Sequence, residues 1–239
     1  MTSSMRVAPR ASTPSRAART RARATTTTTT TRRPPRLVLL DRDGVINVDV
    51  GAPGVTDVKD FRLVRNAARA IRALNDANVR TCVCTNQTAI GKGLVEASYV
   101  TETIHGAMRE TLARDAGAEL GTIYYAWKAR TEPCGRRKPE PGMLLEALEE
   151  CGVEAADAVF VGDTVTDMQA AARAGVGRAL VCTGYGETMG EALRARNVSL
   201  PHTIVMRADD PTMSFPDECF PFDVYEDLYH FVRCAFADA

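Results

Sequence analysis

The most restrictive feature of the sequence is a short apolar run, LVLL (residues 37–40), that leads directly into the acidic pair Asp41 and Asp43. An apolar run of this length, bounded by a turn signal, is typical of a buried strand that ends at Asp41. Carboxylates at positions i and i+2 of an extended chain share one side, where each makes the other harder to ionise. A fold tolerates such a pair when a cation lies between the two groups or when one of them holds a proton. The pair therefore indicates chemistry, although Asp43-Gly44 alone would be read as a turn.

Further apolar runs alternate with helical patterns along the chain. We predict strands at residues 79–84, 122–127, 157–161 and 178–182, and helices near residues 67–74, 98–116, 142–151 and 166–174. Residues 201–222 are predicted to form a surface loop, and the spacing of apolar residues from Val224 to Ala235 predicts a terminal helix packed on the sheet. Strands that alternate with helices indicate an α/β fold with a doubly wound parallel sheet covered on both faces.

Polar residues follow directly after several of these runs. Thr85 and Asn86 follow the second predicted strand, and Asp163 and Asp167 follow the fourth. Ligands of such folds bind at the carboxyl ends of the strands, so we expect these residues and Asp41 to converge on one edge of the sheet. Several carboxylates without a histidine cluster suit Mg²⁺, which prefers oxygen ligands.

A cation and several hydrogen-bond donors accompany these carboxylates. Lys138, with the donors of Thr85 and Asn86, suits a phosphoryl group. An aspartate is a competent phosphoryl acceptor, and a covalent intermediate splits the slow hydrolysis of a phosphate ester into two steps. The pattern therefore favours phosphoryl chemistry.

The net charge of zero is the sum of a basic N-terminal segment and an acidic remainder of the chain. Residues 1–36 carry nine arginines and no acidic residue, which leaves 21 basic and 30 acidic residues in the rest of the chain, a net charge of −9. An acidic body argues against a nucleic-acid partner. No apolar run approaches the ~18 residues of a membrane span, so we expect no membrane partner.

The arginine-rich segment also contains seven consecutive threonines, residues 25–31, and no apolar core of a secretory signal. This composition is typical of an organelle transit peptide, and we predict one, disordered, over residues 1–35. The abundance of hydroxyl residues favours the plastid; the mitochondrion is the alternative. A basic tail that is never cleaved, on a cytoplasmic protein, is the other interpretation.

Four segments, DRDGVIN, CTNQ, RRKPEPGML and VGDTVTD, resemble in order the four motifs of the haloacid dehalogenase-like (HAD) phosphatases. The chain is similar in particular to the D,D-heptose 1,7-bisphosphate phosphatases and the related histidinol-phosphatases, through LDRDGVINVD, TNQ, IYY, RKPEPGMLLEA and DMQAA. The resemblance covers about residues 36–190 and implies a HAD-like Rossmannoid fold. We expect this domain to span residues 36–200, with the C-terminal loop and helix of residues 201–239 packed on it. The short intervals between the motifs leave no room for a large cap domain.

The resemblance also implies roles for the four aspartates. Asp41 would be the nucleophile that becomes an aspartyl-phosphate. Asp43 would protonate the leaving oxygen and then act as the base on water. Asp41, the backbone carbonyl of Asp43, and Asp163 would hold Mg²⁺. Asp167 would support them, or it would be a first-turn acid that favours the helix dipole.

The resemblance assigns the substrate contacts to four further residues. Thr85 and Lys138 would bind the phosphoryl oxygens, with Asn86 nearby; Thr85 as a helix N-cap is the alternative. Arg137 would recognise a second phosphate or another part of the substrate.

The chain departs from the resemblance in the segment before the Arg-Lys-Pro motif. Bacterial heptose phosphatases commonly carry a structural zinc loop there, of pattern C-x-H followed by C-x-C. The corresponding positions are occupied by Ala126, Lys128, Cys134 and Arg136. One thiolate cannot hold a structural zinc, so we predict no zinc.

The sequence therefore predicts a Mg²⁺-dependent phosphatase that hydrolyses a small sugar phosphate through an aspartyl-phosphate, and we expect it to be a monomer. Histidinol-phosphatase is the first alternative, and a nucleic-acid end phosphatase is the second. A binding module that keeps the fold without catalysis is the alternative from another class.

Overall fold

The computed structural model describes residue 1, residues 33–129 and residues 131–237. The chain divides into two units, Met1–Arg33 and Pro34–Ala239, and all the helices and strands given below belong to the second. The predicted transit peptide, residues 1–35, lies almost entirely outside the described residues, so that interpretation stays a prediction.

Seven strands form a single sheet in the order β3-β2-β1-β4-β5-β7-β6. Neighbouring strands run parallel, except that β6 is antiparallel to β7. The predicted α/β class with a parallel sheet is therefore confirmed. The strands are β1 (Leu37–Leu40), β2 (Arg80–Asn86), β3 (Ile123–Ala126), β4 (Ala158–Gly162), β5 (Gly177–Val181), β6 (His202–Ile204) and β7 (Phe222–Tyr225).

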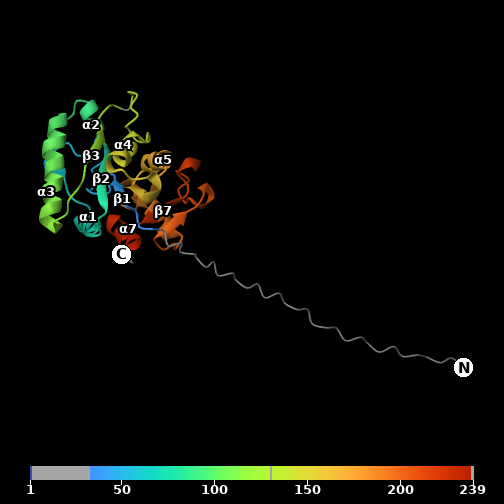
Figure 1. The fold of residues 1–239 in the computed structure, drawn as a ribbon. Helices are drawn as coiled ribbons and strands as arrows, with labels where there is room; N and C mark the ends of the chain where they lie inside the picture. Colours follow the sequence, from blue (N-terminus) through green and yellow to red (C-terminus); the bar gives the residue numbers. More distant parts are fainter. Residues whose placement is uncertain (2–32, 130, 238–239) are drawn as a thin grey trace. The chain divides into compact units, whose positions relative to one another are not determined.

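Helices cover both faces of this sheet (Figure 1). Helices α1, α3 and α7 pack on one face, α4 and α5 pack on the other, and α6 lies beside the C-terminal strands. A π-helical segment, Tyr99–Ile104, leads directly into α3. The helices are α1 (Ala67–Asp76), α2 (Thr88–Gly91), α3 (His105–Ala116), α4 (Gly142–Cys151), α5 (Val165–Ala174), α6 (Glu187–Ala195) and α7 (Leu228–Ala235).

The central strand β1 shows why the apolar run forms a buried strand. Successive side chains of a strand point to opposite faces. Val38 and Leu40 accordingly pack in the core beneath α1, α3 and α7, whereas Leu37 and Leu39 pack in the core beneath α4 and α5. Because both faces are covered, all four residues are apolar and fully buried.

The C-terminal region differs from the expectation. The interval predicted as a surface loop, residues 201–222, contains strand β6 and the first residue of β7, and the predicted terminal helix begins at Leu228 rather than at Val224. Strand β6 has only three residues, too few for the alternation of apolar and polar residues to be recognised. Val224 is buried because it lies in β7, between β5 and β6.

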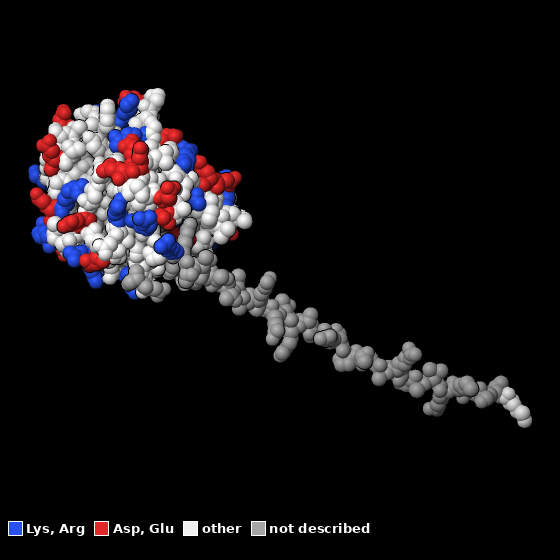
Figure 2. Space-filling view, viewed as in Figure 1, with Lys and Arg blue, Asp and Glu red and all other residues white. Residues whose placement is uncertain are grey.

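Basic and acidic side chains are interspersed over the face of the body drawn in Figure 2. Among the described residues, no helix combines the length and the apolar character that crossing a membrane requires.

Candidate active site

The carboxyl ends of β1, β2 and β4 bring the predicted site residues together. Strand β1 lies between β2 and β4, with Leu40 beside both Val83 and Val161. Asp41 directly follows β1, and its N–H donates to the Val161 carbonyl at 2.9 Å. Asp163 follows β4, and Thr85 and Asn86 are the last two residues of β2. The predicted convergence on one edge of the sheet is therefore found.

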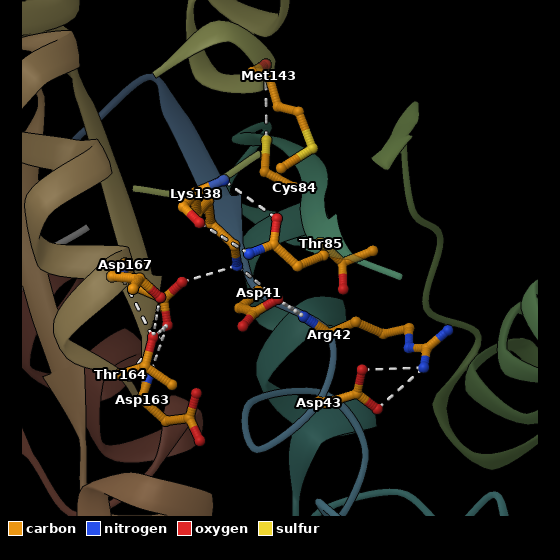
Figure 3. A network of polar contacts seen from close by, with 12 residues as sticks. Asp41, Arg42, Asp43, Cys84, Thr85, Lys138, Met143, Asp163, Thr164 and Asp167 are labelled. Carbon is orange, nitrogen blue, oxygen red and sulfur yellow. Dashed lines mark hydrogen bonds and ion pairs between the residues drawn. The ribbon is translucent and has the colours of Figure 1, made fainter. Parts of the chain in front are cut away.

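Three carboxylates form the centre of the site. Asp41, Asp163 and Asp167 are all buried, and each offers an oxygen atom within 4.8 Å of the others. Within the described part of the chain, this is the only group of three or more acidic, histidine or cysteine residues close enough to hold a metal ion. Lys138 lies between two of them, with its Nζ 2.9 Å from Asp41 Oδ1 and 2.7 Å from Asp167 Oδ1 (Figure 3). One ammonium group leaves this cluster with an excess of negative charge.

Burial and this excess of negative charge together shift the pKa values in the cluster. Burial raises the pKa of Asp41 to about 7; Lys138 lowers it only in part, and the repulsion from Asp167 adds to the rise. Burial and the repulsion from Asp167 and Asp41 raise the pKa of Asp163 well above its ordinary value. Burial alone would lower the pKa of Lys138, but the neighbouring carboxylates raise it instead, so the lysine stays charged. A cation bound among the carboxylates would relieve the repulsion.

The surroundings of Asp163 fit such a cation. The N–H of Tyr185 donates to Asp163 Oδ2 at 2.8 Å, whereas Asp163 Oδ1 is buried and has no hydrogen-bond partner. Gly44 and Gly184 both have positive φ, and a Cβ atom added to either would lie 2.0 or 2.2 Å from Asp163 Oδ2. Only glycine leaves space for this carboxylate. A buried, unpartnered carboxylate oxygen beside two further carboxylates fits Mg²⁺.

Asp167 combines the two roles that the sequence left open. It occupies the third position of α5 and forms a capping box with Thr164, whose Oγ1 lies 2.7 Å from Asp167 Oδ2. The same Oδ2 accepts hydrogen bonds from the backbone N–H groups of Asp163 and Thr164. Its other oxygen, Oδ1, makes the contact with Lys138. Asp167 therefore caps the helix, holds the turn that carries Asp163 and orients the lysine.

Asn86 holds the backbone at Lys138 rather than pointing toward a substrate. Its Nδ2 donates to the Lys138 carbonyl and its Oδ1 accepts from the Lys138 N–H, each at 3.1 Å. The adjacent Thr85 is buried, and its Oγ1 accepts a hydrogen bond from Gln87 Nε2 at 3.0 Å. The end of β2 therefore fixes the segment that carries the lysine, 52 residues further along the chain.

Asp43 lies apart from the three-carboxylate cluster. Its side chain is turned toward the guanidinium group of Arg42, which donates from Nη2 to both carboxylate oxygens at 3.0 and 2.9 Å (Figure 3). Asn47 Nδ2 and Gln87 Nε2 donate to the same carboxylate at 2.9 and 3.1 Å. Burial alone would raise the pKa of Asp43, but Arg42 and these hydrogen bonds outweigh it and lower the pKa. The structure therefore places the Asp43 side chain outside the candidate metal group.

The segment before Lys138 lies beside the site without joining the cluster. Arg137 Nη1 donates to the Lys128 carbonyl at 3.2 Å, and Arg136 forms an ion pair with Glu146 at 2.9 Å. Gly91 of α2 packs so closely on the Trp127–Ala129 backbone that a Cβ atom would lie 2.4 Å from the Trp127 carbonyl oxygen. Arg137 therefore contacts the backbone of its own loop.

Sequence reasoning missed three residues around Asp43. Arg42, Asn47 and Gln87 all donate to its carboxylate, but the motifs that contain them assign them no role. The signal in the sequence is the position of Arg42 between two aspartates directly after a buried strand, because a charged residue there needs a partner of opposite charge.

Comparison with known proteins agrees with this geometry. The family model of the haloacid dehalogenase-like hydrolases matches residues 39–175. The chain is 36% identical to the D-glycero-beta-D-manno-heptose-1,7-bisphosphate 7-phosphatase of Pseudomonas aeruginosa over 158 residues, which are 66% of this chain and 87% of the relative. It is 34% identical to the corresponding enzyme of Thermosynechococcus vestitus over 164 residues, 64% of this chain and 82% of the relative.

The fold is also that of a solved relative. The D,D-heptose 1,7-bisphosphate phosphatase from B. bronchiseptica, complexed with magnesium and phosphate, superimposes with a TM-score of 0.70 at 28% identity, covering 85% of this chain and 99% of that chain.

The chain belongs to the haloacid dehalogenase-like hydrolases. It is a phosphatase of that superfamily, homologous to the heptose bisphosphate phosphatases, whose structures lack a large cap domain, and its buried aspartate triad fits a Mg²⁺ site. The predicted family and fold class are confirmed.

Proposed function

We propose that this protein hydrolyses a sugar phosphate monoester through an aspartyl-phosphate on Asp41, as a D-glycero-D-manno-heptose 1,7-bisphosphate 7-phosphatase would. The observation that carries the proposal is the position of Asp41. Its carboxylate follows the central strand, contacts Lys138 at 2.9 Å and lies within 4.8 Å of two further carboxylates. A nucleophile, a cation for phosphoryl oxygens and oxygen ligands for Mg²⁺ therefore meet at one point.

In the first step, the Asp41 carboxylate attacks phosphorus and the bond from phosphorus to the sugar oxygen breaks. Asp43 gives a proton to the departing oxygen, and Lys138 stabilises the charge on the phosphoryl oxygens. In the second step, Asp43 takes a proton from water, which attacks the aspartyl-phosphate and releases inorganic phosphate. Asp41 and Asp163 would hold Mg²⁺, which when bound neutralises negative charge of the carboxylates and the phosphoryl group.

The environment of Asp43 suits the second of these steps directly. Its lowered pKa keeps the carboxylate ionised in the free protein, as a base requires. A phosphate dianion that enters the site brings like charge close to Asp43 and favours the protonated form. The substrate itself therefore promotes the acid form that the first step needs.

Phosphate release by the purified full chain tests the substrate class. Heptose 1,7-bisphosphate, histidinol phosphate and an oligonucleotide with a 5′ phosphate would be compared in Mg²⁺. We expect the heptose bisphosphate to have the highest kcat/KM. A higher value for histidinol phosphate or for the oligonucleotide would replace this proposal with the corresponding alternative.

Metal requirements are tested with the same preparation. EDTA should abolish activity and Mg²⁺ should restore it, and Ca²⁺ should inhibit because its longer bonds and higher coordination number misplace the phosphoryl group. Elemental analysis should find no zinc, since Cys134 is the one cysteine in the four compared positions. About one zinc per chain that is lost on Cys134→Ser would contradict the proposed alignment.

We further propose that residues 1–35 direct the protein to the plastid, on the support of their acid-free composition rich in arginine and threonine. A fluorescent protein fused to this segment should accumulate in plastids. A fusion that stays in the cytoplasm would overturn the proposal.

A further inference from the structure

Arg42 is the largest of the fully buried side chains, with none of its surface exposed. A guanidinium group removed from water has five N–H donors to satisfy and no acceptor of its own. Arg42 Nη2 donates hydrogen bonds to both carboxylate oxygens of Asp43, at 3.0 and 2.9 Å. Its second terminal nitrogen, Nη1, lies 3.3 Å from His105 Nε2. The planar guanidinium group therefore connects His105 to Asp43.

His105 contributes a lone pair to this contact. Its side chain is 4% exposed, and its ring meets Tyr125 edge to face at a centroid distance of 6.2 Å. Because arginine only donates, Nε2 has to be the acceptor, which places the ring proton on Nδ1. Burial and the neighbouring positive charge of Arg42 lower the pKa of His105 to about 4, so the ring is neutral at physiological pH. His105 therefore acts as an acceptor and not as a proton carrier.

The backbone before His105 contains an irregular helical segment that directs the ring toward Arg42. The π-helical segment Tyr99–Ile104 ends directly before His105, where α3 begins. A π turn holds one residue more than an α turn, and each residue rotates a helix by about 100°, so such turns redirect the residues that follow. The turn presents His105 to Arg42, 63 residues earlier in the chain.

We infer that His105 is a positioning residue: by accepting a hydrogen bond from Arg42 it fixes the guanidinium group, and through that group it fixes the carboxylate of Asp43. The inference rests on the catalytic role proposed for Asp43. Rotation of the guanidinium plane would move Nη1 and Nη2 together, so the contact at one nitrogen restrains the other. Asn47 and Gln87 restrain the same carboxylate from other directions, so His105 refines the orientation and does not create it.

A double-mutant cycle tests this inference in the full chain. His105→Leu removes the acceptor at similar volume, and His105→Gln keeps one. We expect His105→Leu to lower kcat/KM for an alkyl phosphate about tenfold, part of the ~10²–10⁴-fold that a positioned acid contributes. His105→Gln should recover to within about threefold of wild type. In an Asp43→Asn background, His105→Leu should change kcat/KM by less than about twofold, because the residue it acts through is already disabled.

Leaving-group dependence gives a second readout that loss of structure would not produce. Departure of an alkoxide needs a proton far more than departure of p-nitrophenolate does. His105→Leu should therefore slow the alkyl phosphate more than p-nitrophenyl phosphate, by about fivefold in the ratio of kcat/KM values. Thermal unfolding of each variant verifies that it is folded, and His105→Phe, which also lacks an acceptor, replaces His105→Leu if that variant does not fold.

The outcomes separate this inference from the proposed function. Equal effects of His105→Leu in the wild-type and Asp43→Asn backgrounds, or equal activity of folded His105→Gln and His105→Leu, would overturn the positioning role. Full activity of Asp43→Asn itself would overturn the proposed function, and the inference with it. Equal impairment of Asp43→Asn on both substrates would exclude Asp43 only as the acid that protonates the leaving oxygen. The double-mutant cycle would still decide whether His105 acts through Asp43.

Discussion

Asp41 and Asp43 are two positions apart at the end of one strand, yet their surroundings are opposite. Asp41 faces two other carboxylates and a single lysine, and its pKa is raised to about 7, chiefly by burial. Asp43 is surrounded by donors from Arg42, Asn47 and Gln87, and its pKa is lowered even though burial opposes this. Around Asp41, negative charge exceeds the single positive charge of Lys138, whereas the carboxylate of Asp43 is already paired with Arg42.

The difference shows that the charge environment of a carboxylate depends on which segments supply its partners. The partners of Asp41 come from β4, α5 and the segment before α4. Those of Asp43 come from its own loop and from the end of β2. The proposed function would complete the Asp41 side with a cation and a phosphoryl group. The hydrogen bonds around Asp43, by contrast, are already formed in the free protein.

Among the variants that test this difference, Asp41→Asn is expected to have the largest effect on activity. The amide cannot act as the nucleophile, so we expect kcat for the sugar phosphate to fall at least about 10³-fold. The free energy of unfolding should change by less than about 1 kcal/mol, because the lost ion pair with Lys138 is offset by relief of repulsion from Asp163 and Asp167. Steady-state kinetics and urea unfolding measure the two quantities. Phosphate release at the wild-type rate would exclude Asp41 as the nucleophile.

Lys138→Met tests the charge balance on the Asp41 side. The change leaves three buried carboxylates without their ammonium partner, and we expect the free energy of unfolding of the metal-free protein to fall by about 3–5 kcal/mol. Urea unfolding in EDTA provides the measurement, and the exposed Lys59→Met is the matched control. A loss below about 1 kcal/mol would show that the carboxylates take up protons easily enough to do without the lysine.

The pH dependence of stability should have opposite signs for His105, which contacts Arg42 beside Asp43, and for Asp41. Unfolded His105 takes up a proton below pH 6.5, but the folded ring does so only near pH 4. The neutral ring therefore makes its full contribution to the free energy of unfolding above pH 6.5. This contribution is lost as the pH falls toward 4, by about 3 kcal/mol in total. Asp41 has the opposite sign, because its raised pKa favours the folded state as the pH falls below about 7 in the metal-free protein.

Comparison with His105→Gln isolates the histidine from the acidic groups. The difference in unfolding free energy between wild type and this variant should shift by about 3 kcal/mol between pH 7.5 and pH 4, because glutamine does not titrate. Urea unfolding at closely spaced pH values gives the curve. A constant difference would mean that the folded ring takes up its proton at the same pH as the unfolded ring, contrary to its role as a buried acceptor.

Thr164→Ala has the smallest expected effect. It removes the N-cap of α5 and one hydrogen bond to Asp167, which should lower the free energy of unfolding by about 1 kcal/mol. Thr164→Ser keeps the hydroxyl and is the matched control, with stability expected near that of wild type. Identical losses for alanine and serine would assign the effect to the methyl group instead of the cap.

The sequence predicts the edge of the sheet where the site lies because strand ends are marked by abrupt changes from apolar to polar residues. Asp41, Thr85 and Asp163 each follow such a change, and all three meet at the predicted edge. The sequence does not predict which carboxylates face one another. Asp43 was grouped with Asp41 because alternate residues share a side, but the chain turns after Asp41 and Arg42 draws the Asp43 side chain away.

The functions of Asn86 and His105 lie beyond pattern reasoning for a related reason. Asn86 grips the backbone of Lys138, 52 residues away, and His105 contacts Arg42, 63 residues away. Such contacts depend on the packing of loops whose lengths carry no periodic signal. The short strand β6 was missed because three residues cannot display a period.

The place of the last helix has a consequence for how the chain is made. Leu228, Phe231 and Val232 of α7 lie in the same core as Ile71 of α1, and β7 supplies the neighbour of β5. On the ribosome, β1, β2 and β4, which lead to the candidate site residues, emerge before these elements do. A nascent chain, or the product of a premature stop codon near residue 220, would expose the face of α1 and the open edge of β5. Such a chain would contain every segment of the candidate site while part of its apolar core was still uncovered.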